Sequence, residues 1–444
     1  MIGSGFSQRL FLLWIGALVL GVGPAVLAND VYAERGFQGV SAVAASWDDP
    51  STPNAGVYGV GMDGGGLLGV GQDVDPNTGL GDRLKLDVDC DAGESVATAV
   101  RVARRGAKIT ISGICQEQIV IRKDGITLDG QGTAGFDGAT LFGAREFNAL
   151  ITVDGARDVT LKGLYTRNGP AEGIVIEDLA EVVVRDVTST DNVNVGMIVD
   201  HARVRLDGGD FSRNQGGVDT TNNASILLSG DITFAQNGQF GIAASNGAAI
   251  DVRGATINAS DNTLAGVLVE GGHLAVFNFN ESVGSQILAN NNGLAGLVIA
   301  AQGSVEFIAP PLFFFSGVNL VQTNNNQDFG IILTTGSSLE SGFGAATFEI
   351  QGNPVGLSVT SGSNVTITGG LEITNNSGPG LLADGAGTVT IAPLTGIDPL
   401  GSEIVNNNPD VVLEFGSRAA FDATVGTIEC NDGTAIARGS ISCP

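Results

Sequence analysis

A recurring unit of about two dozen residues dominates this sequence from residue 150 onward. Each unit holds an Asn, a short gap, a Gly and an apolar triplet, as in Gly173-Ile174-Val175-Ile176. The Gly residues that open these triplets lie 21 to 34 residues apart, at Gly173, Gly196, Gly217, Gly241, Gly266, Gly296, Gly330, Gly356 and Gly380. Internal repetition at this period is typical of solenoid proteins, in which each unit buries its apolar face against its neighbours.

Each unit also holds three short runs that favour β-structure, which in one unit are 173–177, 182–186 and 187–190. Three such runs leave no room for a helix, and each is too short for a hairpin meander. The pattern therefore predicts one coil of a parallel β-helix per unit, with neighbouring coils about 4.8 Å apart. Two earlier turns and one later turn extend the series to about twelve coils, in a single all-β domain.

An Asn recurs just before the Gly of each unit. These residues are Asn168, Asn192, Asn214, Asn237, Asn262, Asn292, Asn326, Asn353, Asn376 and Asn408. Asn tolerates a left-handed backbone, and its side chain bonds nearby backbone groups. We therefore expect these residues at a sharp corner between strands, stacked as an asparagine ladder along the column.

On this Asn…Gly-Ile-x-Val repeat, the chain resembles the right-handed parallel β-helix superfamily, the pectin-lyase-like proteins, over about residues 86–430. The N-terminal entry supports the resemblance, because Val96, Ala99, Val100 and Ala103 follow helical spacing. A short helix within 86–115 is expected to cap the first coil. The superfamily includes lyases, epimerases, hydrolases, adhesins and binding proteins, so the resemblance implies a fold and leaves the activity open.

The N-terminus reads as a secretory signal peptide over residues 1–28. Arg9 supplies the positive charge, Leu10 to Val22 the apolar stretch, and Val26 and Ala28 the small-residue cleavage site. Residues 29–85 are Gly-rich without periodicity and are predicted to be a flexible linker. The β-helix is expected over 86–444, in a secreted, periplasmic or cell-surface protein. No later segment reaches the roughly 20 apolar residues of a membrane span.

Four Cys residues in an exported chain favour disulfide pairing. Three connectivities are possible for Cys90, Cys115, Cys430 and Cys443. Pairing between sequence neighbours is favoured, because each pair then flanks one end of the repeats. Cys90–Cys115 and Cys430–Cys443 are thus expected to be structural bridges, the second closing the C-terminal end at about 415–444. Neither spacing suits zinc.

Carboxylates recur at the end of the first strand of the early units. They are Asp129, Asp154, Glu177 and Asp200, expected to stack at about 4.8 Å on an outward-facing position. Like charges this close either raise pKa values or recruit a cation, and oxygen ligands favour Ca²⁺. Two interpretations stay open for this row, a calcium site and, favoured as the simpler one, a solvated turn position that tolerates short polar residues.

Asp200, His201 and Arg203 form the best candidate catalytic set, because a lyase or epimerase needs a base and a neutralising cation beside a uronate. The Asp-Pro-His-Asp signature of mannuronan epimerases is absent, as are the Arg-Pro pair of pectate lyases and the polygalacturonase signatures. A surface histidine without a catalytic role is the competing interpretation.

Charge restricts the partners. The chain holds 47 acidic and 21 basic residues, for a net charge of −26, which argues against nucleic acid and anionic membrane surfaces. The other outward position of the first strand is mostly aliphatic, at Val175, Ile198, Asp219, Ala243, Leu268, Val298, Ile332, Ser358, Leu382 and Val412. A parallel sheet that is apolar on both faces is usually covered. We expect the N-terminal segment, a second copy of the chain or an apolar ligand to cover it.

Two functions remain open from the sequence. The first is a non-catalytic secreted β-helix that binds polysaccharide or cell-surface glycan, or serves as a structural scaffold. The second is a calcium-using polysaccharide lyase or C5-epimerase that acts on an acidic polysaccharide. The missing signatures and the aliphatic outer position favour the first.

Overall fold

The computed structural model describes residues 85–141, 149–277, 284–308, 318–342, 345–392, 402–421, 424–425, 427–431 and 434–437. The chain divides into two units, residues 1–58 and 59–444, and all the described residues belong to the second. The predicted signal peptide and the predicted linker up to residue 84 lie outside the described residues. No helix of the described ranges is long and apolar enough to cross a membrane.

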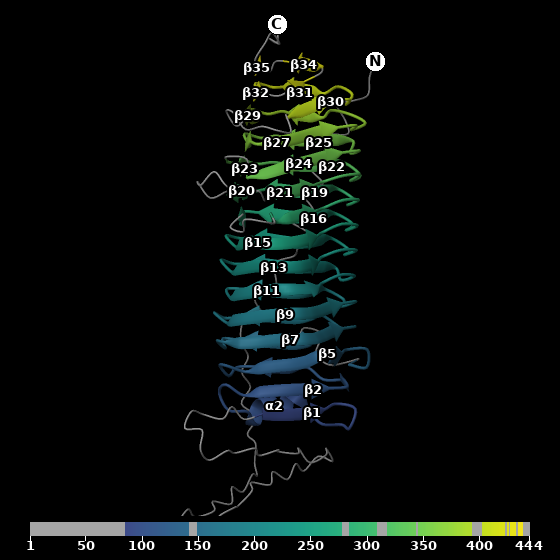
Figure 1. The fold of residues 1–444 in the computed structure, drawn as a ribbon, viewed down its shortest axis with the longest axis vertical. Coiled ribbons are helices and arrows are strands. Elements are labelled where there is room, and N and C mark those ends of the chain that lie inside the picture. Colours follow the sequence, from purple (N-terminus) through teal and green to yellow (C-terminus); the bar gives the residue numbers. More distant parts are fainter. Residues whose placement is uncertain are drawn as a thin grey trace, which may run out of the picture. The chain divides into compact units, whose positions relative to one another are not determined.

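Two parallel sheets run along the β-helix, and the chain passes between them once per coil (Figure 1). The 13-stranded sheet consists of β4 (Ile119–Ile121), β6 (Ile151–Asp154), β8 (Ile174–Glu177), β10 (Val195–Asp200), β12 (Gly216–Thr221), β14 (Phe240–Ser245), β16 (Ala265–Glu270), β19 (Ala295–Ala300), β22 (Phe329–Leu333), β25 (Val355–Val359), β28 (Leu381–Ala383), β31 (Val411–Glu414) and β34 (Ile428–Asn431). Its strands follow the predicted coil repeat, and the predicted parallel β-helix is confirmed.

The 22-stranded sheet carries the rest of each coil. Its strands are β1 (Lys85–Asp89), β2 (Lys108–Ser112), β3 (Ile114–Cys115), β5 (Thr127–Asp137), β7 (Val159–Arg167), β9 (Glu181–Thr190), β11 (Arg203–Asp210), β13 (Ser225–Thr233), β15 (Ala249–Asn258), β17 (His273–Phe277), β18 (Gln286–Leu288), β20 (Ser304–Ile308), β21 (Asn319–Gln322), β23 (Ser338–Ser341), β24 (Ala346–Gln351), β26 (Asn364–Thr368), β27 (Gly370–Thr374), β29 (Thr388–Ala392), β30 (Glu403–Val405), β32 (Arg418–Phe421), β33 (Thr424–Val425) and β35 (Thr434–Ala437).

The second and third predicted runs of an early coil form one bent strand rather than two. Residues 182–186 and 187–190 both lie in β9, and the bend falls at Asp186, whose φ is +49°. In β13 the corresponding bend falls at Gly230, with φ +75°, beside a register shift against β15. From β17 and β18 onward the corner is wide enough to separate the two strands. Residues 278–283 and 309–317, between the strands of two such pairs, lie outside the described residues.

Inward side chains stack in columns that cross the coils. Leu161, Val184, Leu206 and Leu228 lie in register on β7, β9, β11 and β13, and all are buried. Further along, Phe307 and Phe348 pack edge to face, with ring centroids 5.1 Å apart. Each buried side chain of this size stabilises the fold by roughly 1.5–3 kcal/mol relative to exposure. Because every coil repeats the contribution, one narrow core serves the whole column.

A chain of buried asparagines links the coils at the corner before the 13-stranded sheet. The backbone N–H of each donates to Oδ1 of the next Asn, one coil further on, at 2.8–3.0 Å. The series runs Asn192, Asn214, Asn237, Asn262, Asn292, Asn326, Asn353, Asn376 and ends with Asn407 as the last acceptor. Asn168 lies outside this chain, since its side chain donates to Asp137 at an exposed position. Asn407 takes the place expected for Asn408.

The left-handed residue of this corner is the one before the buried Asn. Asp191 has φ +58°, Arg213 +57° and Asn291 +57°. The asparagines therefore act through their side-chain hydrogen bonds, and the expectation that they themselves supply the left-handed backbone is wrong for these coils. The last link is Asp410, which accepts from the backbone N–H of Asn407 and of Thr427.

A helix closes the N-terminal end, as expected. It is α2 (Val96–Val102), with Val96, Ala99 and Val100 buried against the first coils. Ser95 caps its N-terminus by accepting from the N–H of Thr98. The Cys90–Cys115 disulfide joins the segment before the helix to β3, which confirms that predicted bridge. The other predicted bridge lies outside the described residues, because Cys443 is not among them.

Candidate functional site

The ends of the early strands of the 13-stranded sheet carry a row of polar side chains. We call this row the carboxylate strip; it consists of Asp154, Glu177, Asp200, Thr221, Ser245 and Glu270. The register aligns Asp154 with Glu177, Asp200 with Thr221, and Ser245 with Glu270. Neighbouring members are thus one coil apart, about 4.8 Å along the column.

Asp129 does not belong to this strip, contrary to the expectation from sequence. It lies in β5 of the other sheet, in register with Thr110 on one side and Lys162 on the other. Its carboxylate forms an ion pair with Lys108 Nζ at 2.7 Å, and its pKa is lowered by Lys108 and by the N–H of Gln131, although burial opposes this. The strand that precedes β6 in the 13-stranded sheet is β4, whereas the run that ends at Asp129 belongs to β5 of the 22-stranded sheet. The sequence analysis therefore assigned this run to the wrong sheet.

Like charges raise the free energy of the ionised strip at its centre. Burial and then the carboxylates of Asp178, Asp154 and Asp200 raise the pKa of Glu177. Asp154 has a counter-ion, because Arg122 Nε lies 2.7 Å from its Oδ2. Burial also raises the pKa of Glu270. The strip is therefore an acceptor-rich surface that favours hydrogen-bond donors or cations.

No group of three or more His, Cys, Asp or Glu side chains in the described part of the chain is close enough to hold a metal ion. Asp154, Glu177 and Asp200 lie in neighbouring coils, each at the end of its strand, and calcium binding by this row stays a prediction.

Asp200 ends β10 and His201 follows it, and their side chains meet, as the candidate catalytic set requires. His201 Nδ1 lies 2.7 Å from Asp200 Oδ1, and Asn222 Nδ2 donates to the same oxygen at 2.9 Å. Because the carboxylate can only accept, Nδ1 is the donor, and in the neutral ring Nε2 keeps its lone pair. Arg203 begins β11 in the other sheet, with an exposed side chain. The structure thus joins the first two members and places the third on a different sheet.

Asp219 is a residue that the sequence analysis did not single out. It lies in β12 on the outward face, in register with Ile198 and Ala243. Burial first, then the charges of Asp200 and Glu270, raises its pKa to about 6. An acid within an otherwise aliphatic column was the signal in the sequence that could have identified it.

The outward column beside the strip is only half exposed. Val175, Ile198 and Leu268 are half-buried, whereas Ala243, Ile332 and Val412 are buried at 3%, 5% and 7% exposure. Phe240 lies at one end of β14 over Gly216, where a Cβ atom would come within 2.7 Å of the ring. The strip is therefore flanked by apolar surface.

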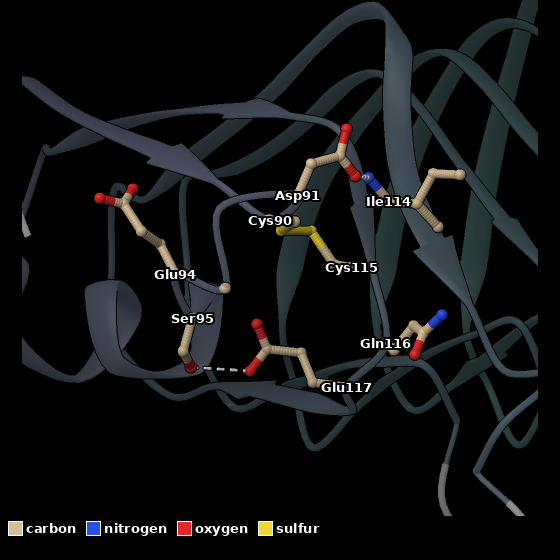
Figure 2. Close-up of a pocket in the computed structure, with 9 residues that line it drawn as sticks. Cys90, Asp91, Glu94, Ser95, Ile114, Cys115, Gln116 and Glu117 are labelled. Atoms are coloured by element: carbon tan, nitrogen blue, oxygen red, sulfur yellow. Dashed lines mark hydrogen bonds between the residues drawn. A yellow bond between two sulfur atoms is a disulfide. The ribbon is translucent and has the colours of Figure 1, made fainter. Parts of the chain in front are cut away.

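A hollow of about 530 Å³ lies at the N-terminal end, beside the cap. Figure 2 shows its lining, with the Cys90–Cys115 disulfide at the centre. Asp91 Oδ1 accepts from the N–H of Ile114, and Ser95 Oγ donates to Glu117 Oε2 at 2.8 Å. These side chains are occupied in holding α2 against the first coil.

Comparison with protein families agrees with this architecture, since residues 107–257 match the model of the right-handed beta helix region. The chain therefore has the fold of a parallel β-helix. The sequence matches no curated protein. Three solved structures are among those to which this chain is similar. The A-module of a mannuronan C-5 epimerase from Azotobacter vinelandii shares 13% identity, covers 75% of this chain and 84% of its own, and has a TM-score of 0.35.

The second is a DFA-IIIase from Arthrobacter chlorophenolicus A6, with 13% identity, coverage of 71% of this β-helix protein and 92% of that chain, and a TM-score of 0.35. The third is PfbA, a surface adhesin of Streptococcus pneumoniae, with 10% identity, coverage of 78% and 84%, and a TM-score of 0.32. At these identities and TM-scores the likenesses carry no argument about the activity of this β-helix.

Proposed function

We propose that this β-helix is an exported scaffold that binds an uncharged polysaccharide along the carboxylate strip. Two rows run side by side on the outer face of the 13-stranded sheet, and they carry the proposal. One row consists of acceptor oxygens at the strand ends, and the other of half-buried aliphatic side chains. A sugar ring has hydroxyl edges and apolar C–H faces, so it complements both rows at once.

The charge of the strip argues for an uncharged ligand. Glu177, Asp200 and Glu270 accept hydrogen bonds from hydroxyl groups, and an ionised carboxylate offers several acceptor positions. A uronate polymer would meet the net charge of −26 and the like charges around Glu177. The predicted signal peptide and the Cys90–Cys115 disulfide support an extracellular or periplasmic location.

The test is calorimetric titration of the full chain with a panel of neutral and uronic polysaccharides. The double variant Glu177→Gln with Asp200→Asn should weaken binding of the neutral polymer at least tenfold. The matched control is Glu340→Gln, which removes an exposed carboxylate from β23 on the other sheet and should bind as the wild type does. Equal loss in both variants, or binding of none of the neutral polymers, would overturn the proposal.

A second candidate function rests on the Asp200–His201 hydrogen bond. We infer that a histidine oriented by a carboxylate through Nδ1 could act as a base through Nε2. In a lyase or epimerase this base would remove the proton next to the carboxylate of a uronate, with Arg203 as the candidate cation. An absorbance assay for unsaturated uronates, with and without Ca²⁺, tests the lyase. A signal that His201→Gln abolishes would support it, and a flat trace on every uronate polymer would overturn it.

A further inference from the structure

The corner that follows the strands of the 13-stranded sheet has a left-handed backbone in coil after coil. It is formed by Gly155 after β6, by Asn222 after β12 and by Asn246 after β14, with φ of +65°, +54° and +51°. Glycine has no Cβ atom to clash, and the short side chain of asparagine can bond its own backbone, so both residues suit this corner. Bulky apolar side chains do not suit it.

Two coils nevertheless place a bulky apolar residue at this corner. Leu179 follows β8 with φ +64°, and Phe415 follows β31 with φ +46°. No other left-handed residue in the described part of the chain is large and apolar. Their side chains are 68% and 70% exposed, so burial does not offset the backbone strain. This combination of strain and exposure indicates that the two side chains serve a contact outside the folded chain.

Each of the two residues lies beside a carboxylate that ends the preceding strand. Glu177 ends β8, and Glu414 ends β31. The N–H of Leu179 donates to the carbonyl of His201 at 2.8 Å, so this leucine also lies next to the corner of the following coil. One edge of the 13-stranded sheet therefore combines an acceptor with an exposed apolar side chain at two separate points.

The distance between the two points bears on the kind of partner. β8 and β31 lie nine steps apart in the 13-stranded sheet, which is roughly 43 Å at about 4.8 Å a step. Two apolar side chains so far apart do not form the contiguous patch that a protein interface needs. A linear polysaccharide can reach both, and each of its units offers hydroxyl groups to a carboxylate and a C–H face to an apolar side chain.

We propose that Leu179 and Phe415 are two apolar contact points for one polysaccharide chain, each packing against the C–H face of a sugar unit whose hydroxyl groups bond to Glu177 or Glu414. This inference rests on the proposed function, and it extends the ligand from the carboxylate strip, which ends at β16, as far as β31. A chain that is held at the strip meets the second point at a high effective concentration. Long chains should therefore bind more tightly than short ones.

The experiment is calorimetric titration of the full chain with oligosaccharides of a neutral β-glucan, a mannan and a galactan, each four and ten units long. At least one ten-unit oligosaccharide should bind the wild type at least tenfold more tightly than its four-unit counterpart. Leu179→Asn should weaken the binding of both lengths about fivefold. Phe415→Asn should weaken the ten-unit chain about fivefold and leave the four-unit chain unchanged, because the short chain cannot extend from the strip to β31. Phe415→Trp should restore the affinity for the ten-unit chain.

The chain offers a matched control for exposure alone. Val193 is an apolar residue that is 64% exposed, and it lies before β10, at the other end of the strands. Val193→Asn should leave both affinities unchanged. Leu179→Asn and Phe415→Asn should unfold at the same temperature as the wild type or higher, because asparagine suits a left-handed corner and the side chains removed are exposed. A loss of binding in these variants is then not a loss of folding.

Failure of this inference can be told apart from failure of the proposed function. Unchanged affinity for the ten-unit chain in either Leu179→Asn or Phe415→Asn would overturn the inference, and so would an equal loss in Val193→Asn. The proposed function would still stand if Glu177→Gln with Asp200→Asn abolished binding. If no neutral oligosaccharide binds the wild type, the proposed function fails and this inference fails with it.

Discussion

Glu117 and Lys123 hold the two ends of the capping helix α2 from one short segment of the next coil. Glu117 Oε1 accepts from the N–H of Val96 at 2.6 Å, and its Oε2 accepts from Ser95 Oγ and from the N–H of Ala97. Lys123 Nζ donates to the carbonyls of Val100, Arg101 and Ala103 at the other end. The negative group meets the N-terminus and the positive group the C-terminus, so both complement the helix dipole.

This arrangement predicts that the cap depends on Glu117. Glu117→Ala removes the acceptor of two helix N–H groups and of the Ser95 hydroxyl, and it should lower the free energy of unfolding by about 2–3 kcal/mol. Denaturant unfolding measures the change, and hydrogen exchange should show faster exchange at Val96 and Ala97.

Arg105→Met is the matched control, because the Arg105–Asp124 pair is exposed on the same end of the molecule. Exposed pairs contribute about 0–1 kcal/mol. If the two variants unfold alike, the helix is not held in the manner described.

The asparagine chain makes a second prediction about stability. Asn292→Ala leaves the N–H of Asn262 without its acceptor and removes the bond that Asn292 Nδ2 donates to Asn326 Oδ1 at a fully buried position. We expect a loss of about 2–4 kcal/mol, since each unsatisfied buried group costs about 1–3 kcal/mol. Asn364→Ala, at an exposed position of β26 outside the chain of asparagines, should cost less than about 1 kcal/mol. Similar losses at both positions would show that the ladder has no special role.

Asp219 predicts a pH-dependent effect of substitution. Its folded pKa of about 6 lies above the unfolded value near 3.9, so the folded state favours the neutral acid. Below about pH 4 the carboxyl is neutral in both states and does not lower the free energy of unfolding. As the pH rises from about 4 through about 6, ionisation of Asp219 lowers the free energy of unfolding. Asp219→Asn should raise the free energy of unfolding at pH 8 by up to about 3 kcal/mol and leave it nearly unchanged at pH 4.

Thermal unfolding at several pH values measures this effect. Asp251→Asn is the comparison, because that carboxylate lies at a surface pair with Arg253 on the other sheet. If the gain in stability from Asp219→Asn is the same at pH 4 and at pH 8, the pKa of Asp219 is not raised in the folded state.

Asp191 should respond to pH in the opposite direction. Its hydrogen bonds with Arg213, at 2.9 and 3.0 Å, lower its pKa below the ordinary value. The stability from this pair is present above the unfolded pKa and is lost as the pH falls through the folded one. Asp191→Asn should therefore be mildly destabilising at pH 7 and neutral near pH 2, as measured by denaturant unfolding. A destabilisation of the same size at both values would point to lost packing instead of lost charge.

Much of the fold could be predicted from repetition alone. The Gly and Asn spacing predicted the coil, and Val96, Ala99 and Val100 at helical spacing predicted the cap, because a solenoid repeats one local solution and each coil meets only its neighbours. The pairing of Cys90 with Cys115 followed from their positions at one end of that repeat. The same periodicity placed Asp154, Glu177 and Asp200 in one row, since a residue three positions beyond the same corner returns to the same face in each coil.

Only the tertiary structure decided which side chains act together across coils. It placed Asp129 on the other sheet, moved the left-handed corner to the residue before each buried Asn, and set Asp219 in a half-buried apolar row. It also brought Glu117 and Lys123 to opposite ends of α2. These relationships depend on register between strands 20 to 34 residues apart, and on burial by neighbouring coils, neither of which a local pattern contains.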